Sequence, residues 1–104
     1  MNTILELERL EERAGDAARL LGQLANEKRL LALCHLVERE RSVGELASLV
    51  GLSQSALSQH LARLREDGLV ATRREGQTIW YRLGDPRAVR VLAVLHEIYC
   101  ADAI

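Results

Sequence analysis

Apolar residues recur every three or four positions through the first forty residues, the spacing that places them on one face of an α-helix. The pattern predicts a first helix over residues 4–24 and a second over about 27–40, and Asn26 is suited to cap the start of the second. The apolar positions at helical spacing in the first helix are Leu7, Leu10, Ala14, Ala17, Leu21 and Leu24. The expected buried stripe of the second helix is Leu30, Leu33, Cys34 and Val37.

Two short amphipathic helices joined at a glycine follow from residue 42 onwards. Ser42 and Glu45 have the spacing of a capping box, in which the hydroxyl accepts from the Glu amide and the carboxylate reaches back to the Ser amide. A helix over 43–50 therefore begins here, Gly51 supplies the turn, and Ser53 caps a helix over 54–66. This order predicts a helix-turn-helix over residues 43–66, with Leu57, Leu61 and Leu64 on the buried side of its second helix.

Residues 69–74 and 78–83 are typical of two strands joined by a turn at 75–77, so residues 69–83 are expected to form a β-hairpin, the wing. Pro86 is suited to the first turn of a last helix over 86–101. That helix is apolar nearly all round, and a chain of 104 residues cannot cover every side of it. We therefore expect one domain over residues 1–104, mainly α with a small β-hairpin (an α+β winged helix-turn-helix), that forms a homodimer through the helices at 4–24 and 86–101.

The charge of the chain is −1 overall but unevenly distributed. Residues 51–83 carry five basic and three acidic side chains, whereas residues 1–50 carry seven basic and nine acidic ones, so the basic surplus lies in the second helix of the helix-turn-helix and the wing. The N-terminus is acidic and lacks the apolar core of a signal peptide, and no apolar run reaches the ~20 residues of a membrane span. These features predict a cytoplasmic protein without membrane contact, whose two cysteines are free thiols.

The solvent side of the 54–66 helix carries the residue types that read base edges in a major groove. Side chains near the start of a recognition helix usually contact bases, whereas later ones reach bases or phosphates, and basic wing residues contact the backbone or minor groove. The expected partner is a palindromic double-stranded operator, read by two copies of the chain. The candidate contacts are Ser53, Gln54, Ser55, Ser58, Gln59, His60 and Arg63 on the helix, and Arg73, Arg74 and Gln77 on the wing.

Three segments give the chain a resemblance to the ArsR-type winged-helix repressors: LANEKRLLAL at 24–33, SVGELASLVGLSQSALSQHLARLREDGLV at 42–70 and RREGQTIWYRL at 73–83. Cys34 and Cys100 resemble, in placement and spacing, the pair of the dithiol, persulfide-sensing branch of that family. The resemblance implies a transcriptional repressor whose Cys34 and Cys100 are crosslinked by a persulfide or polysulfide inducer, or by another oxidant, so that operator DNA is released. It implies no cofactor.

The metal sites of that family are missing from their usual positions. Residues 41–46 lack the ELCVCDL type of motif, and the zinc pattern that would start at Asp85 meets Arg87, Ile98 and Ala101. A zinc site made by Cys34, His35, His96 and Cys100 stays open as the metal-sensing alternative, because thiolate and imidazole suit zinc.

Three further alternatives remain. Cys34 lies on the expected apolar stripe and could be an inert core residue. The winged helix could be a protein-interaction module, or a regulator of DNA whose signal is not redox. No nucleophile–base set, phosphate-binding glycine loop or acid pair is present, so an enzyme is not expected.

Overall fold

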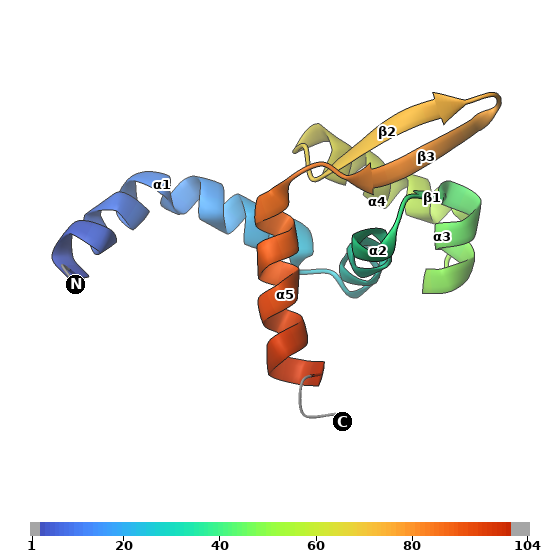
Figure 1. Ribbon diagram of the computed structural model, residues 1–104. Coiled ribbons are helices and arrows are strands. Elements are labelled where there is room, and N and C mark those ends of the chain that lie inside the picture. The colour runs from blue at the N-terminus through green and yellow to red at the C-terminus, as the bar shows by residue number, and fades with distance from the viewer. Residues whose placement is uncertain (1–2, 101–104) are drawn as a thin grey trace.

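The computed structural model describes residues 3–100, which form five helices and three strands (Figure 1). The observed order confirms the predicted winged helix-turn-helix. The elements are α1 (Thr3–Leu24), α2 (Glu27–Glu38), β1 (Arg41–Ser42), α3 (Val43–Val50), α4 (Gln54–Glu66), β2 (Val70–Glu75), β3 (Thr78–Leu83) and α5 (Pro86–Cys100).

The sheet has three antiparallel strands in the order β1-β3-β2, where a two-stranded hairpin was expected. In the wing, β2 and β3 pair from Val70 with Leu83 at the base to Glu75 with Thr78 at the tip. The added strand β1 pairs with β3 through Arg41 with Tyr81. Two residues are too short to show the alternation that marks a strand, so the sequence pattern could not reveal β1. Its pairing ties the middle of β3 to the start of the helix-turn-helix.

The core is built by leucines that α2, α3, α4 and the start of β2 turn toward one another. Ser42 and Ser53 cap α3 and α4 as predicted, and Gly51 ends α3 in the left-handed region at φ 75°. These local signals fix where the helices start and stop, and so bring their apolar faces together. The largest fully buried side chains are Leu33, Leu46, Leu57, Leu61, Leu64 and Leu69.

The buried face of α2 differs from the predicted stripe. Asn26 caps the helix as expected, with its side chain accepting from the amides of Lys28 and Arg29, but the helix ends at Glu38. Cys34 and Val37 are exposed and Leu30 is half-buried, whereas Arg29, Ala32, Leu33 and Leu36 are buried. The predicted buried face of α2 was wrong because the Arg29 side chain points inward and donates to backbone carbonyls. A pattern of hydrophobic residues does not reveal such an interaction.

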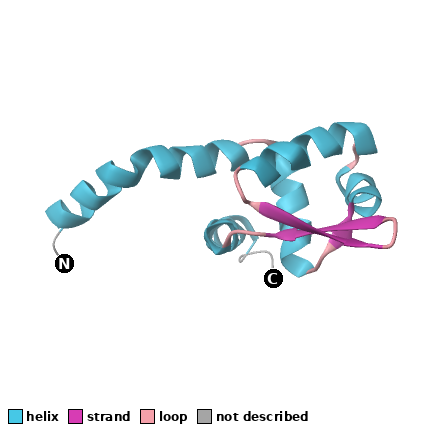
Figure 2. Cartoon of the chain, turned by 90° about the horizontal axis from the view of Figure 1, so that it is seen from above, coloured by secondary structure: helices cyan, strands magenta, loops and turns pink. Residues whose placement is uncertain are grey.

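Helices α1 and α5 leave much of their apolar surface uncovered. Both views show α1 projecting away from the rest of the chain (Figures 1 and 2). On α1, Leu7, Leu10 and Leu21 are each more than half exposed, and on α5 the same holds for Val94 and Ile98. Only Ala88 and Leu92 of α5 are buried in the core. No helix among residues 3–100 has the length and apolar character that a membrane crossing requires.

Candidate nucleic-acid interface and thiol site

The start of α4 presents a row of exposed polar side chains, as the sequence predicted. The hydroxyl of Ser53 accepts from the amide of Ala56 at 3.1 Å, so this residue also fixes the first turn of the helix. The side chain of Gln54 lies against Gly44 of α3, in the space that a glycine without a Cβ leaves open. Along the face opposite the buried leucines, the exposed candidates are Ser53, Gln54, Ser55, Ser58, Gln59 and Arg63.

His60 does not share that exposure. It is half-buried, and its Nδ1 lies 3.4 Å from Nη1 of Arg29 in α2. The Arg29 side chain also donates to the carbonyl of Gln23 at 2.8 Å, and desolvation, followed by repulsion from Arg63, lowers its pKa. His60 was placed on the solvent side because it follows the polar positions of α4, but α2 covers it. Its contact with DNA remains a prediction, and the structure gives it a packing contact instead.

The two wing arginines stand in different surroundings. Arg73 binds the Glu40 carboxylate at 2.9 Å and that of Glu75 at 2.8 Å, and its guanidinium lies 5.7 Å from the centre of the Trp80 ring. The bonds to Glu75 and then Glu40 raise the pKa of Arg73. Arg74 is exposed, and within residues 3–100 its side chain makes no hydrogen bond or ion pair. Gln77, in the turn at the wing tip, is exposed as well.

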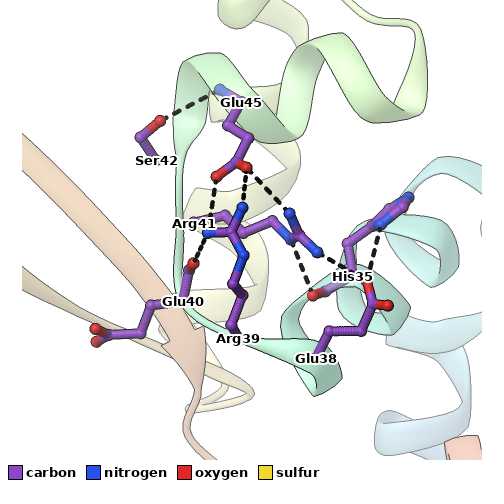
Figure 3. A network of polar contacts seen from close by, with 7 residues as sticks. All are labelled: His35, Glu38, Arg39, Glu40, Arg41, Ser42 and Glu45. Atoms are coloured by element: carbon purple, nitrogen blue, oxygen red, sulfur yellow. Dashed lines mark hydrogen bonds and ion pairs between the residues drawn. The ribbon is translucent and has the colours of Figure 1, made fainter.

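A polar cluster joins the end of α2 to the start of α3 (Figure 3). Arg41, only 8% exposed, donates to Glu38 at 2.7 Å, to Glu45 at 3.0 Å and to the carbonyl of His35 at 3.1 Å. Arg39 also binds Glu45, and these bonds lower the pKa of Glu45 although desolvation opposes the shift. The capping box is therefore half correct. The Ser42 hydroxyl accepts from the amide of Glu45 at 3.2 Å, but the carboxylate binds the two arginines and does not return to Ser42.

Cys34 opens into a mostly apolar groove of about 620 Å³ between α2 and α5. Both cysteines are free and exposed, so the alternative of an inert core cysteine is wrong for Cys34. Desolvation in the groove, and then repulsion from the Cys100 thiolate, raise the pKa of Cys34. The groove is lined by Leu31, Cys34, His35, Val37 and Glu38 of α2 and by Val89, Leu92, Ala93 and His96 of α5.

Cys100 lies on the same stripe of α5 that borders the groove. Val89, Ala93 and His96 line it, and a step of four residues from His96 reaches Cys100, so all four share one helical face. His35 and His96 border the groove too, but across residues 3–100 no three His, Cys, Asp or Glu side chains gather in a way that could hold a metal ion. Cys34 thus lines the groove, and Cys100 follows on the same face of α5, one turn beyond the last lining residue.

The comparisons with known proteins match this architecture. The model of the bacterial regulatory proteins of the arsR family matches residues 26–72. The transcriptional activator HlyU of Vibrio cholerae is 50% identical over 96 residues, which cover 92% of this chain and 89% of HlyU. The chain belongs to the ArsR family. It is therefore a winged-helix DNA-binding transcriptional regulator and not an enzyme.

Solved structures of relatives superpose closely on the chain. The transcriptional repressor BigR from Xylella fastidiosa has a TM-score of 0.85 at 45% identity, covering 89% of this chain and 95% of BigR. Reduced HlyU from Vibrio cholerae has a TM-score of 0.84 at 50% identity, covering 89% and 98%. The homodimeric winged helix-turn-helix domain of a possible ArsR-family regulator from Mycobacterium bovis has a TM-score of 0.76 at 32% identity, covering 86% and 83%.

Sequence reasoning missed the charged side chains that hold the reader in place. Arg29 and Arg41 are both nearly buried, and Asp67, at the end of α4, accepts from Arg19 at 2.6 Å and from Gln23 at 2.6 Å, which tie it to α1. Their partners are backbone carbonyls or side chains three to 48 positions away, on other elements of the fold. The one available signal was an arginine at a helical core position, as at Arg29, since a charge there requires compensating acceptors.

Proposed function

We propose that this regulator is a homodimeric repressor that releases operator DNA when reactive sulfur species, persulfides in the first place, crosslink Cys34 to Cys100. The observation that carries the proposal is the position of the two thiols. Cys34 opens into the groove between α2 and α5, and Cys100 lies one turn beyond His96 on the face of α5 that lines this groove. Helix α2 packs on the reader, whereas α5 carries uncovered apolar surface suited to a second subunit.

The DNA side of the proposal rests on the exposed row at the start of α4. Gln54 and Gln59 offer amides for adenine, Arg63 offers a guanidinium for guanine or phosphate, and the serines offer hydroxyls. Arg74 and Gln77 extend the surface along the wing toward the DNA backbone. One protomer has few unpaired cations, so tight binding requires the two half-sites of a palindrome and two copies of the chain.

The dimer is supported by the apolar surface that α1 and α5 leave exposed. Leu7, Leu10 and Leu21 lie along α1, and Val94 and Ile98 lie on α5 away from the groove-lining stripe. Large exposed apolar side chains gathered on two helices favour an interaction site, and pairing of identical surfaces about a twofold axis would cover both copies. The Mycobacterium bovis relative is itself described as homodimeric.

The chemistry balances in two steps. The thiolate of one cysteine attacks the outer sulfur of a persulfide R–S–SH, forms a protein persulfide and expels the thiolate R–S⁻. The thiol of the other cysteine then attacks the inner sulfur, forms the Cys34–Cys100 disulfide and expels hydrogen sulfide. The persulfide is reduced and the dithiol is oxidised. The description of one HlyU structure as reduced fits a regulator of this branch with two redox forms.

The test is operator release by wild type and by two serine variants. Fluorescence anisotropy with a duplex taken from upstream of the gene would be recorded before and after glutathione persulfide, glutathione disulfide and peroxide. Wild type should lose affinity about 5–150-fold after persulfide treatment, the usual range of allosteric coupling. Cys34→Ser and Cys100→Ser should bind DNA normally and not respond.

Intact-mass measurement on the same samples reports the crosslink. The chain has no third cysteine, so the loss of two hydrogen atoms from one chain assigns a disulfide to this pair, and added multiples of about 32 mass units count inserted sulfur atoms. Release of DNA by either serine variant would contradict the proposal. A wild-type protein that is crosslinked but keeps its DNA would contradict it as well.

A further inference from the structure

One buried charged residue, Arg41, joins the α2 wall of the groove at Cys34 to the helix-turn-helix. We infer that Arg41 is the positioning residue through which a displacement of α2 at Cys34 reaches the helix-turn-helix and the wing together. This inference rests on the proposed function, because it concerns how a crosslink at the groove changes DNA affinity.

The side chain of Arg41 is bonded to both sides of the joint. It donates to the carbonyl of His35 and to the carboxylate of Glu38 on α2, and to the carboxylate of Glu45 in the first turn of α3. His35 directly follows Cys34 in the sequence and lines the same groove. Figure 3 shows the guanidinium between the carboxylates of the two helices. A shift of the groove side of α2 therefore acts on Arg41 without an intermediate residue.

The backbone of Arg41 belongs to a third element. As the first residue of β1 it pairs with Tyr81 of β3, and Ser42 beside it caps α3. Glu40, on the other side, binds Arg73 of β2 at 2.9 Å. The segment 39–42 is thus joined to α2, to α3 and to the wing, and Arg41 is its buried member.

Because Arg41 is buried, its bonds to α2 and α3 hold the two helices together more rigidly than a surface ion pair would. The side chain of Arg41 is 9% exposed, and a buried charge is costly unless its acceptors stay in place. Movement of α2 away from α3 would strand the guanidinium with one carboxylate, so the lower-energy response is for α3 and β1 to follow α2. Surface pairs such as Arg13 with Asp16, each about two-thirds exposed, exert no such constraint.

The test measures, for each variant, the DNA affinity of the reduced protein divided by that of the persulfide-crosslinked protein. This quotient is called the affinity ratio. Arg41→Met is expected to form the crosslink, as intact mass would show. Its affinity ratio should nevertheless be less than about 3, whereas the ratio of wild type is expected to lie at about 5–150. Arg41→Lys retains the charge but not the planar fork that spans two carboxylates, so its ratio should lie between the two.

Two further variants separate coupling from folding. Glu38→Gln changes a side chain that is 67% exposed and leaves Arg41 bonded to Glu45, so it should fold normally and still lower the ratio at least about twofold. The matched control is Lys28→Met, because Lys28 also joins α2 to α3, donating to the Val50 carbonyl at 2.7 Å, but at the end of α2 away from His35. Its ratio should equal that of wild type.

The outcomes are distinct. If Arg41→Met and Glu38→Gln weaken both redox states equally and keep the wild-type ratio, Arg41 has only a structural role and the inference is overturned. If Arg41→Met does not fold, the affinity ratio of Glu38→Gln is compared with that of Lys28→Met. A lower ratio for Glu38→Gln alone supports the inference, and equal ratios overturn it. A wild-type protein that keeps its DNA after crosslinking overturns the proposed function, and the inference with it.

Discussion

Two adjacent wing arginines should differ in how they affect DNA binding, although their sequence positions are nearly equivalent. Arg74 is exposed and makes no ion pair within the part of the chain that the structure describes, so it is available to a phosphate. Arg73 is held by Glu40 and Glu75, and a phosphate would have to displace one of these carboxylates or accept both as neighbours. Arg74→Gln should therefore remove a phosphate contact, whereas Arg73→Gln should not.

The magnitude follows from counterion release. Each phosphate contact contributes about 0.9 to the slope of log affinity against log salt, and a dimer carries two copies, so Arg74→Gln should flatten the slope by about 1.8. Between 50 and 200 mM salt the difference between wild type and variant should shrink roughly tenfold, since a slope of about 1.8 acts over a fourfold change in salt. Arg73→Gln should leave the slope within about 0.5 of the wild-type value.

Fluorescence anisotropy of the promoter duplex over that salt series measures both slopes. A slope change for Arg73→Gln as large as that for Arg74→Gln would refute the reasoning, because it would show that the carboxylates do not keep Arg73 from the phosphates. An unchanged slope for Arg74→Gln would refute it from the other side. Melting curves of the two variants, recorded in parallel, establish that the wing is folded.

Three further predictions concern single groups. Ser53→Ala removes the cap of α4 and should lower the free energy of unfolding in urea by about 1 kcal/mol; no change would contradict the capping role. Cys100→Ser should move the pH profile of Cys34 alkylation to lower pH, since one of the two causes that raise its pKa is gone, and an unmoved profile would show that the thiols do not interact. Hydrogen bonds from Arg19 and then Gln23 lower the pKa of Asp67, so its stabilising contribution is present above the unfolded value of about 3.9 and lost as pH falls through the folded pKa. Asp67→Asn should therefore lower the melting temperature near neutral pH but not in strong acid, and an equal deficit at every pH would rule out this pair.

The parts of the fold that could be predicted from the sequence are those fixed by neighbouring residues. Ser42, Gly51 and Ser53 mark their helix ends through bonds and backbone angles within a few positions, so the helix-turn-helix was placed to the residue. Strand β1 was missed because it exists only through its pairing with β3, a contact some forty positions away. The exposed row on α4 was predicted for the same local reason, except at His60, which α2 covers.

The thiol site could not be derived from local pattern at all. Periodicity placed Cys34 in the core, and it lies instead on the groove side of α2, because the inward turn of Arg29 shifts the phase of the helix. Only the family resemblance indicated that Cys100, 66 positions later, belongs with it. Pairs of residues far apart in the sequence depend on how whole helices pack. The hydrophobic periodicity of a single sequence does not reveal that packing.

The two faces of α5 have different surroundings, which bears on the proposed switch. Val89 and Ala93 line the groove at Cys34, and Cys100 continues their face of the helix, while Val94 and Ile98 lie on another, uncovered face. In the proposed dimer one rigid helix would therefore present its sulfur to α2 and its second face to the partner. A crosslink that rotates α5 relative to α2 would then change the distance between the two DNA-reading helices. The reason is that both α2, which packs on the reader, and the dimer contact are positioned by α5. Most of α5 is apolar because two of its faces pack against other elements in the proposed dimer. Cys100, the last residue of α5, is the reactive side chain at the end of the face that lines the groove.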